Sequence, residues 1–296
     1  MPEVDHLMNL PQDLDAAVAQ AVTDLLQETS CLVSECQTHQ VVVVQGWATT
    51  PDTVRCLATY LVGLLASAIT TTLEVRAQIT NSDADRLELL RSTEQIVGRS
   101  AAPLTVDQKQ DQRNPWIAEG LWHLYFFLAS RQTALHPLGS IVAVGFPHVA
   151  AKDHGLDVLA IYRDGSHFGL SVVESKAYEN DPNGAISDAV KTFRRIDDGK
   201  YDSSIRQFVA TARMTLPSEQ QSAVSPSLWK DLRSYIPNPH YDSQNLTDWS
   251  NKRPSFSRLA VPAKRVIVMP HAVDQFTKFF DEVAAAMLAV AENFNV

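Results

Sequence analysis

Two apolar segments joined by a short polar turn place the strongest constraint on the fold of this 296-residue chain. Residues 156–162 and 169–176 are rich in the aliphatic and β-branched residues that favour strands, and Asp164-Gly165 between them is typical of a tight hairpin turn. We therefore expect two adjacent antiparallel strands. Because side chains alternate between the two faces of a strand, Glu174 and Lys176 should share one face.

Three charged residues interrupt these apolar strands, namely Asp157, Glu174 and Lys176. In a hairpin, Asp157 can face the same site as the other two. Neighbouring carboxylates repel each other when ionised, and their oxygens suit Mg²⁺ or Mn²⁺, whose bound waters a substrate phosphate can replace. An ammonium beside them can orient or help deprotonate a water and offset charge in the transition state. The pattern predicts a site that hydrolyses phosphodiesters, and the alternative is an exposed ion pair between strands.

These residues and their spacing resemble the core motif of the PD-(D/E)xK nuclease superfamily, an acidic residue on one strand followed by Glu-x-Lys on the next. The resemblance covers the motif and the strand-strand-helix order around it, and not the N-terminal part of the chain. Leu156 stands here where the family name has Pro. The resemblance implies a restriction-endonuclease-like core, in which a mixed central sheet is flanked by helices, and a Mg²⁺-dependent deoxyribonuclease activity.

An apolar helix is predicted before these strands. Asn114-Pro115 has the residue types of a helix start, with Asn as the cap, and residues 116–128 are apolar nearly all round. Glu119 is the only carboxylate of this buried helix. Many superfamily members carry a Glu on the helix before the catalytic strands, so the resemblance implies that Glu119 completes the metal site. The alternative is a buried Glu that bonds to His123 or to a backbone amide.

A second helix is predicted after the second strand. Asn183-Gly184 breaks the chain, and apolar residues then recur at helical spacing from Ile186 onward. Three cations are neighbours on another face of this helix: Lys191, Arg194 and Arg195. We expect them to contact the phosphates of DNA. The alternative is a solvated face whose cations pair with acidic neighbours, namely Asp188, Asp197 and Asp198.

Charge is distributed unevenly along the chain, whose formal net charge is −9. Residues 1–100 carry 5 Lys and Arg against 13 Asp and Glu, whereas residues 183–270 carry 13 basic and 8 acidic residues, a net of +5. Nucleic acid is therefore expected to bind over the C-terminal part. A protein that is acidic overall binds DNA weakly unless its basic groups cluster or a partner delivers the substrate.

The chain is expected to have two parts with a boundary in the polar stretch 99–113. Residues 1–100 are predicted to form an α/β accessory or interaction domain, and residues 101–296 the nuclease domain. In the first part, helices are expected over residues 14–26, 51–68 and 83–97. Strands are expected there over residues 41–44 and 73–79. This part has no Gly-rich phosphate loop and no nucleophile elbow.

The C-terminal third divides into an irregular stretch and a regular end. Residues 215–263 contain six prolines and are expected to form loops with short helices, whereas residues 265–269 read as a strand. A stripe of apolar residues then recurs at spacings of four and three: Phe276, Phe280, Val283, Met287, Val290 and Phe294. Such a stripe most often packs in the core, and the alternative is a docking face for a second protein or a second copy, as in a homo-oligomer.

Cysteine content and hydropathy bear on the compartment. Cys31, Cys36 and Cys56 have no spacing typical of a zinc site or a disulfide framework and are expected to be reduced. The longest apolar run, residues 60–68, is too short to span a bilayer, and no N-terminal targeting signal is evident. These observations predict a cytoplasmic protein that does not enter the membrane.

Within the superfamily the chain most resembles the nuclease subunits of Hachiman antiphage defence systems. The resemblance rests on Gly155-Leu156-Asp157, on a Glu-x-Lys strand that runs into Tyr178, and on a helix after a Gly. It implies a helicase partner that restrains the nuclease until foreign or damaged DNA is engaged. The alternatives are a stand-alone restriction-type endonuclease and a non-catalytic scaffold subunit of a nucleic-acid-processing complex, in which the three charged residues form only a structural ion network.

Overall fold

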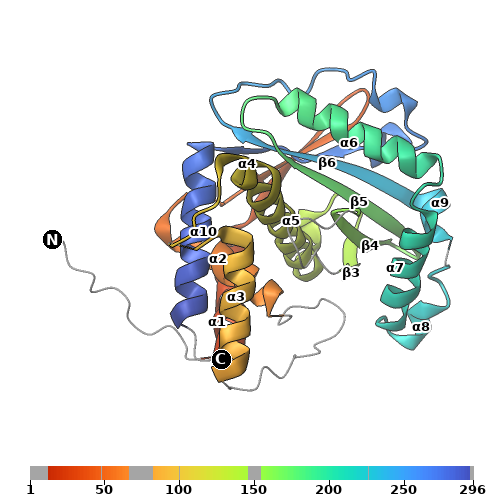
Figure 1. Cartoon of the computed structure of the whole chain (residues 1–296). Coiled ribbons are helices and arrows are strands. Elements are labelled where there is room, and N and C mark those ends of the chain that lie inside the picture. The colour runs from red at the N-terminus through yellow and green to blue at the C-terminus, as the bar shows by residue number, and fades with distance from the viewer. Residues whose placement is uncertain are drawn as a thin grey trace.

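The computed structural model describes residues 13–47, 49–66, 83–99, 101–145, 155–225 and 227–293. These residues form a mixed α/β structure with two mixed sheets (Figure 1). The predicted α/β class is therefore confirmed. The strand predicted over residues 73–79 lies outside the described residues. In the part that is described, no helix combines the length and the apolarity needed to cross a bilayer.

The larger sheet has the strand order β3-β4-β5-β6-β8, and the smaller one has the order β1-β2-β7. In the larger sheet β4 runs antiparallel to both β3 and β5, whereas β6 runs parallel to both β5 and β8. The strands are β1 (Ser30–Glu35), β2 (Gln40–Gln45), β3 (Ser140–Val144), β4 (Val158–Asp164), β5 (His167–Ala177), β6 (Arg233–Asp242), β7 (Ile267–Val268) and β8 (His271–Val273).

Helices cover both faces of the larger sheet. Figure 1 shows α6 over one face and α5 against the other, with α2, α3 and α10 beside α5. The α-helices are α1 (Leu14–Glu28), α2 (Pro51–Leu65), α3 (Asp83–Val97), α4 (Val106–Gln108), α5 (Asn114–Arg131), α6 (Pro182–Asp197), α7 (Asp202–Met214), α8 (Ser218–Gln221), α9 (Leu228–Leu232) and α10 (Phe276–Asn293). The remaining helical turns are the π-helix η1 (Lys109–Arg113) and the 3-10 helices η2 (Thr133–Leu135), η3 (Phe256–Arg258) and η4 (Ala263–Arg265).

The predicted hairpin is formed by β4 and β5, which pair without a bulge from Val158 opposite Val173 to Asp164 opposite His167. Gly165 in the turn has a φ of 57°, a left-handed conformation that glycine adopts without steric cost. The turn therefore fixes the register, and the register decides which residues of the two strands share a face.

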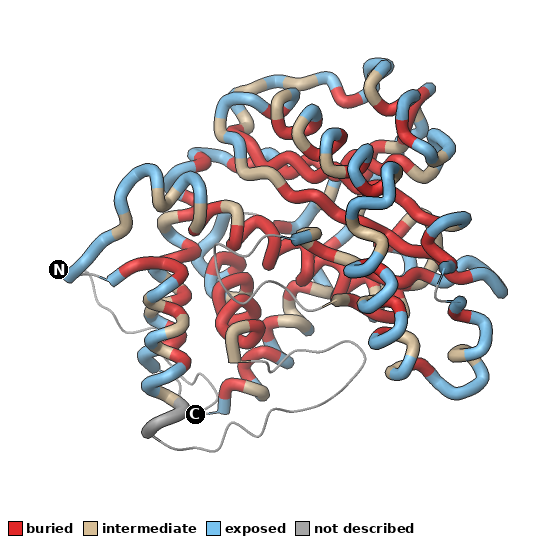
Figure 2. The backbone as a smooth tube through the Cα atoms, turned by 45° about the vertical axis from the view of Figure 1, so that its right-hand side comes forward, coloured by how far each residue is buried: buried red, intermediate tan, exposed pale blue. Residues whose placement is uncertain are grey.

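The two faces of β5 belong to two apolar clusters. Leu170 and Val172 pack in the cluster that includes Phe193 of α6, whereas Val173 packs in the cluster that includes Leu121 of α5. Because side chains alternate, the even-numbered residues of β5 face α6 and the odd-numbered residues face α5. Figure 2 shows that these strands and α5 are mostly buried.

The predicted boundary near residues 99–113 is crossed by shared packing. The cluster on the α5 side combines side chains of α1, α2 and α3 with those of α5 and α10. The two parts are also joined by strand pairing, because β2 runs parallel to β7 with Gln40 opposite Ile267. The division of the chain into domains at residues 100 and 101 stays a prediction.

Both helices around the hairpin begin earlier than the sequence pattern predicts. The turns η1 and α4 run directly into α5, so Asn114 is itself helical, and the cap is Thr105, which forms a capping box with Gln108. The interpretation of Asn114 as a cap is therefore wrong. Likewise, α6 starts at Pro182 rather than near Ile186, because the Asp181 side chain accepts a hydrogen bond from the backbone N–H of Gly184.

The expectation of irregular structure throughout residues 215–263 is wrong for β6, a ten-residue buried strand that contains Pro237 and Pro239. The carbonyl of Pro237 accepts a bond from Met269 N, whereas the carbonyl of His240 accepts one from Tyr178 N at the end of β5. Odd-numbered residues of β6 thus turn their backbone groups away from β5. Pro237 and Pro239 are odd-numbered, so the N–H groups that they lack would not have bonded to β5.

The apolar stripe of α10 packs inside the chain. Phe276, Phe280, Val283, Met287 and Val290 are all buried, in the cluster that contains α2 and α3. The core-packing interpretation is confirmed for these five residues, and Phe294 lies outside the described residues.

Buried histidines make the stability of this fold sensitive to acid. Burial lowers the pKa of His123, His136 and His271 to about 4, against an ordinary value of 6.5. Below pH 6.5 each binds a proton in the unfolded chain but stays neutral in the folded protein. Stability that is fully present above pH 6.5 is therefore lost as the pH falls toward 4.

We predict that the free energy of unfolding falls by about 1.4 kcal/mol per pH unit for each such histidine between pH 6.5 and 4. Urea unfolding at half-unit pH intervals measures this slope. His136→Asn should make this slope shallower by about 1.4 kcal/mol per pH unit, because one of the titrating groups is removed. The matched control is His167→Asn, at the exposed first residue of β5, which should leave the slope unchanged. A slope that His136→Asn does not alter would contradict the prediction.

Candidate active site

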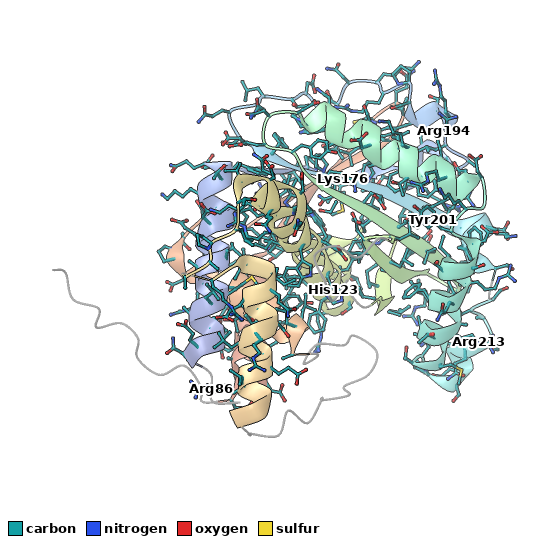
Figure 3. The ribbon with its side chains drawn as sticks, in the orientation of Figure 1. Arg86, His123, Lys176, Arg194, Tyr201 and Arg213 are labelled. Carbon is teal, nitrogen blue, oxygen red and sulfur yellow. The ribbon has the colours of Figure 1, made fainter. Side chains whose placement is uncertain are left out.

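Asp157, Glu174 and Lys176 lie together at one end of the hairpin. Asp157 directly precedes β4, and the other two residues lie near the end of β5, where Figure 3 labels Lys176 beneath α6. Lys176 Nζ is 2.9 Å from Glu174 Oε2 and 3.5 Å from Asp157 Oδ2. The structure thus brings together the three residues that the hairpin pattern selects. Their catalytic roles stay predictions.

Ser175, between the two charged residues of β5, fixes this end of the hairpin from both sides. Its backbone N–H donates to Asp157 Oδ2 at 2.7 Å, which holds the carboxylate against β5. Its hydroxyl points to the opposite face, as the alternation predicts, and donates to Asn238 Oδ1 of β6 at 3.1 Å. Asp157 is therefore positioned by the backbone of the strand that carries the other two charged residues.

Burial governs the electrostatics of the site. Glu174 is only 2% exposed, and burial, followed by the charge of Asp157, raises the pKa of Glu174 above its ordinary value. Burial alone would lower the pKa of Lys176, but Asp157 and Glu174 outweigh it and raise this pKa. The ammonium is thus held in its charged form, whereas the Glu174 carboxylate is costly to ionise without a further cation.

One carboxylate oxygen has no partner in this arrangement. Glu174 Oε2 accepts the bond from Lys176, but Glu174 Oε1 is buried without a hydrogen-bond partner. Buried polar atoms are nearly always paired, and leaving one unpaired costs free energy. An unpaired oxygen beside a second carboxylate is therefore an open ligand position for a cation.

The donor set fits Mg²⁺ or Mn²⁺. Both ions accept carboxylate oxygens, and Mg²⁺ is commonly held by one or two carboxylates while it keeps several waters. Asp157 and Glu174 would hold the ion, with Glu174 Oε1 as the oxygen that lacks another partner. Among the described residues, no group of three or more His, Cys, Asp or Glu side chains is arranged to hold a metal ion.

The structure does not bring Glu119 into this set. Glu119 is buried on α5, which packs against the odd-numbered face of β5, whereas Glu174 and Lys176 lie on the face toward α6. His123, the proposed alternative partner, pairs its Nδ1 with Tyr60 Oη at 2.9 Å, and its ring also bonds to the backbone of Gly145. A role for Glu119 in metal binding stays a prediction.

The three cations of α6 are exposed. Lys191 Nζ forms an ion pair with Asp188 Oδ1 at 2.6 Å, and the Arg195 guanidinium lies 5.4 Å from the ring centroid of Tyr201. Figure 3 shows Arg194 pointing away from the sheet toward the C-terminal end of α6. For Lys191, the alternative expected from the sequence, an exposed cation that pairs with an acidic neighbour, is therefore observed. The role of all three cations in binding DNA stays a prediction.

Two residues that contact the site were not selected from the sequence. Thr192 of α6 lies beside the Glu174 side chain, whose pKa it lowers, and Asn238 of β6 accepts a hydrogen bond from the Ser175 hydroxyl. Asn238 begins a buried polar path, in which Trp122 Nε1 donates to His240 Nε2 at 2.6 Å and the Nδ1 atoms of His240 and His271 lie 3.0 Å apart. The only sequence signal for Asn238 is a polar residue between two prolines, which predicts a loop as readily as a strand.

Comparison with known proteins adds no relative to this geometry. No family model matches the chain, and neither a curated protein nor a solved structure matches it.

Proposed function

We propose that this chain is a metal-dependent nuclease that hydrolyses the phosphodiester bonds of DNA. The observation that carries the proposal is the unpaired buried oxygen of Glu174, beside a second carboxylate and an ammonium at the end of a hairpin. A structural ion network would be expected to pair all of its buried oxygens. A site that receives a divalent cation must keep a ligand position open.

Each of the three residues has a distinct task in this proposal. A divalent cation bound by Asp157 and Glu174 would lower the pKa of a bound water and neutralise charge on the phosphate. Asp157 is oriented for this by Ser175 N–H. Because its neighbours raise the pKa of Lys176, Nζ keeps its proton near neutral pH. It can therefore orient the attacking water and donate to a phosphate oxygen rather than act as a free base.

The order of elements supports this class of enzyme. The hairpin β4–β5 is followed by α6, which is the strand-strand-helix order of the PD-(D/E)xK resemblance, and the buried helix α5 precedes it. The basic stretch at 183–270 includes the exposed cations of α6, which lie within one turn of Thr192 beside Glu174. We propose that these cations contact the DNA backbone.

We further propose that the chain is the effector of a bacterial antiphage defence system and acts with a helicase partner. The support is the sequence resemblance to Hachiman nuclease subunits, together with the acidic net charge of −9, which disfavours unassisted DNA binding. Co-purification with a helicase would separate this proposal from a stand-alone restriction-type endonuclease. A scaffold subunit would show neither cleavage nor a response to divalent metal.

Metal dependence tests the proposed function directly. The protein is incubated with plasmid, linear and single-stranded DNA and with RNA, in Mg²⁺ or in chelator. We expect cleavage of DNA only with Mg²⁺, and a rise in melting temperature on adding Mg²⁺, because the cation binds only the folded site. The rise should be larger at pH 8 than at pH 6, because the cation must displace the proton that the raised pKa of Glu174 retains. Absence of both effects would reject the nuclease proposal and favour the scaffold.

A further inference from the structure

A polar groove lies beside the first turn of α6, outside the carboxylate site. It has a volume of about 280 Å³, and its lining is Asn183, Leu246, Thr247, Asp248, Asn251, Lys252 and Arg253. The lining carries two cations and one carboxylate, and Asp248 Oδ1 is already occupied by bonds from the backbone and hydroxyl of Ser250. The groove is therefore polar, net positive and open to an anion.

The two cations retain bonding capacity. Lys252 is exposed and makes no ion pair with a described residue. Arg253 Nη1 donates to Asn183 Oδ1 at 3.0 Å, and its guanidinium lies over the Trp249 ring at 4.9 Å. Arg253 Nε, however, is buried without a hydrogen-bond partner. Arg253 therefore carries a donor that no described group satisfies, and its guanidinium adds positive charge to the wall of the groove.

The loop that forms the groove is held in place on two sides. Arg253 N donates to Thr38 Oγ1 at 3.1 Å, and His39 Nε2 lies 2.8 Å from the carbonyl oxygen of Trp249. On the other side, Asn245 Nδ2 donates to the carbonyl oxygen of Glu179, just past the end of β5. The groove is thus preformed, which lowers the entropic cost of binding a ligand.

The groove lies at the start of α6, the helix that covers the face of β5 on which Lys176 lies. Tyr178 follows Lys176 at the alternation spacing, is 37% exposed, and donates from Oη to Asp188 Oδ2 of α6. Asn183 in the groove lies nine residues before Thr192, which is about 13 Å along a helix axis. At 3.4 Å per nucleotide this corresponds to about four nucleotides of a B-form strand.

We infer that the groove binds the phosphodiester backbone of the same nucleic-acid strand that crosses the carboxylates, about four nucleotides from the cut. This inference rests on the proposed nuclease function for its substrate. Lys252 Nζ contacts the phosphate, the Arg253 guanidinium adds positive charge beside it, and the exposed side chain of Leu246 provides an apolar surface for the adjoining sugar or base.

The test measures DNA binding in chelator, where no metal-dependent cleavage occurs. Labelled single-stranded and duplex oligonucleotides are titrated with wild type, Lys252→Ala and Lys252→Glu over a series of salt concentrations. Lys252→Glu should lower affinity for DNA by roughly five- to tenfold. Lys252→Ala should reduce the slope of log affinity against log salt by about 0.7 for single strands and about 0.9 for duplex, the loss of one phosphate contact.

The matched control is Lys264→Glu. Lys264 is an exposed lysine of η4, whose neighbour Arg265 bonds to Asp231 before β6, so it lies at the other end of the sheet. This variant should bind DNA as wild type does. Arg253→Lys, which keeps the charge but removes the planar guanidinium, should also weaken binding, with its folding checked by thermal unfolding.

The possible outcomes distinguish failure of the groove as a binding site from failure of the proposed nuclease function. An unchanged affinity and salt slope in Lys252→Glu, or an equal loss in Lys264→Glu, overturns the groove as a binding site even if wild type cleaves DNA. Wild type that binds DNA through Lys252 but never cleaves it with Mg²⁺ supports the groove and rejects the nuclease. Wild type that binds no nucleic acid overturns the inference.

Discussion

Glu174→Gln is expected to abolish Mg²⁺-dependent cleavage while the metal-free protein stays folded and becomes more stable than wild type at pH 8. The Gln side chain keeps the shape of Glu174 and can still receive the bond from Lys176, but it cannot ionise to hold a cation. Loss of a metal-holding carboxylate should lower turnover by at least about three orders of magnitude. The Mg²⁺-induced rise in melting temperature should disappear as well.

The gain in stability follows from the direction of the pKa shift. The folded-state pKa of Glu174 is raised above its ordinary value of 4.5, chiefly by burial. Ionisation therefore favours the unfolded chain increasingly as the pH rises above 4.5, and wild type loses stability over this range. Gln does not titrate, so its advantage should be small at pH 5 and larger at pH 8. Thermal unfolding at both pH values, without metal, measures the difference.

Glu179→Gln is the matched control for this change. Glu179 lies three residues beyond Lys176 and accepts a bond from Thr277 Oγ1 at 3.2 Å, outside the proposed site. This variant should cleave as wild type does and should still respond to Mg²⁺. Cleavage by Glu174→Gln at the wild-type rate would remove Glu174 from the metal site.

The arrangement of the candidate site is largely predictable from the sequence because it depends on local rules. The Asp164-Gly165 turn fixes the hairpin register, and the period of two along β5 places Glu174 and Lys176 on one face. Asp157 then needs only to precede β4 to lie opposite them. No residue far away in the sequence is required to bring these three charges together.

The features that could not be predicted depend on contacts between distant segments. The two prolines of β6 predict a loop from the sequence alone. They are compatible with a strand because β6 bonds to β5 through its even-numbered residues, which depends on a pairing between distant segments. Thr192 and Asn238 reach the site only through the packing of α6 and β6 on β5. Likewise, the groove forms because Arg253 meets Asn183 across 70 residues of sequence.

The position of Glu119 relative to the strands depends on helix packing that the sequence pattern does not specify. The sequence predicts a buried carboxylate on the helix before the strands, and α5 does carry it, buried at 7% exposure. Helical periodicity, however, does not determine which face of the sheet the helix covers. That depends on how α5 packs with α2 and α10, which belong to the same apolar cluster.

Lys176→Ala is expected to separate metal binding from catalysis. Removing a positive charge beside the carboxylates should leave affinity for Mg²⁺ near or above that of wild type, while turnover falls by roughly two to three orders of magnitude. Lys176→Arg should rescue little, because a planar guanidinium does not replace a compact ammonium at 2.9 Å from Glu174 Oε2. Paired Mg²⁺ titration and single-turnover cleavage measure the two effects, with the distant Lys264→Ala as a matched control.

The ion pairs of Lys176 should also stabilise the metal-free protein. Without the ammonium, Glu174 and Asp157 lose their shared counter-charge, so the metal-free Lys176→Ala protein should melt at a lower temperature than wild type. Mg²⁺ should then raise its melting temperature by more than it raises that of wild type, because the cation supplies the missing charge. If the variant instead lost metal binding and stability together, and its residual cleavage followed only the folded fraction, Lys176 would be a structural ion-pair partner and the nuclease proposal would lose its main support.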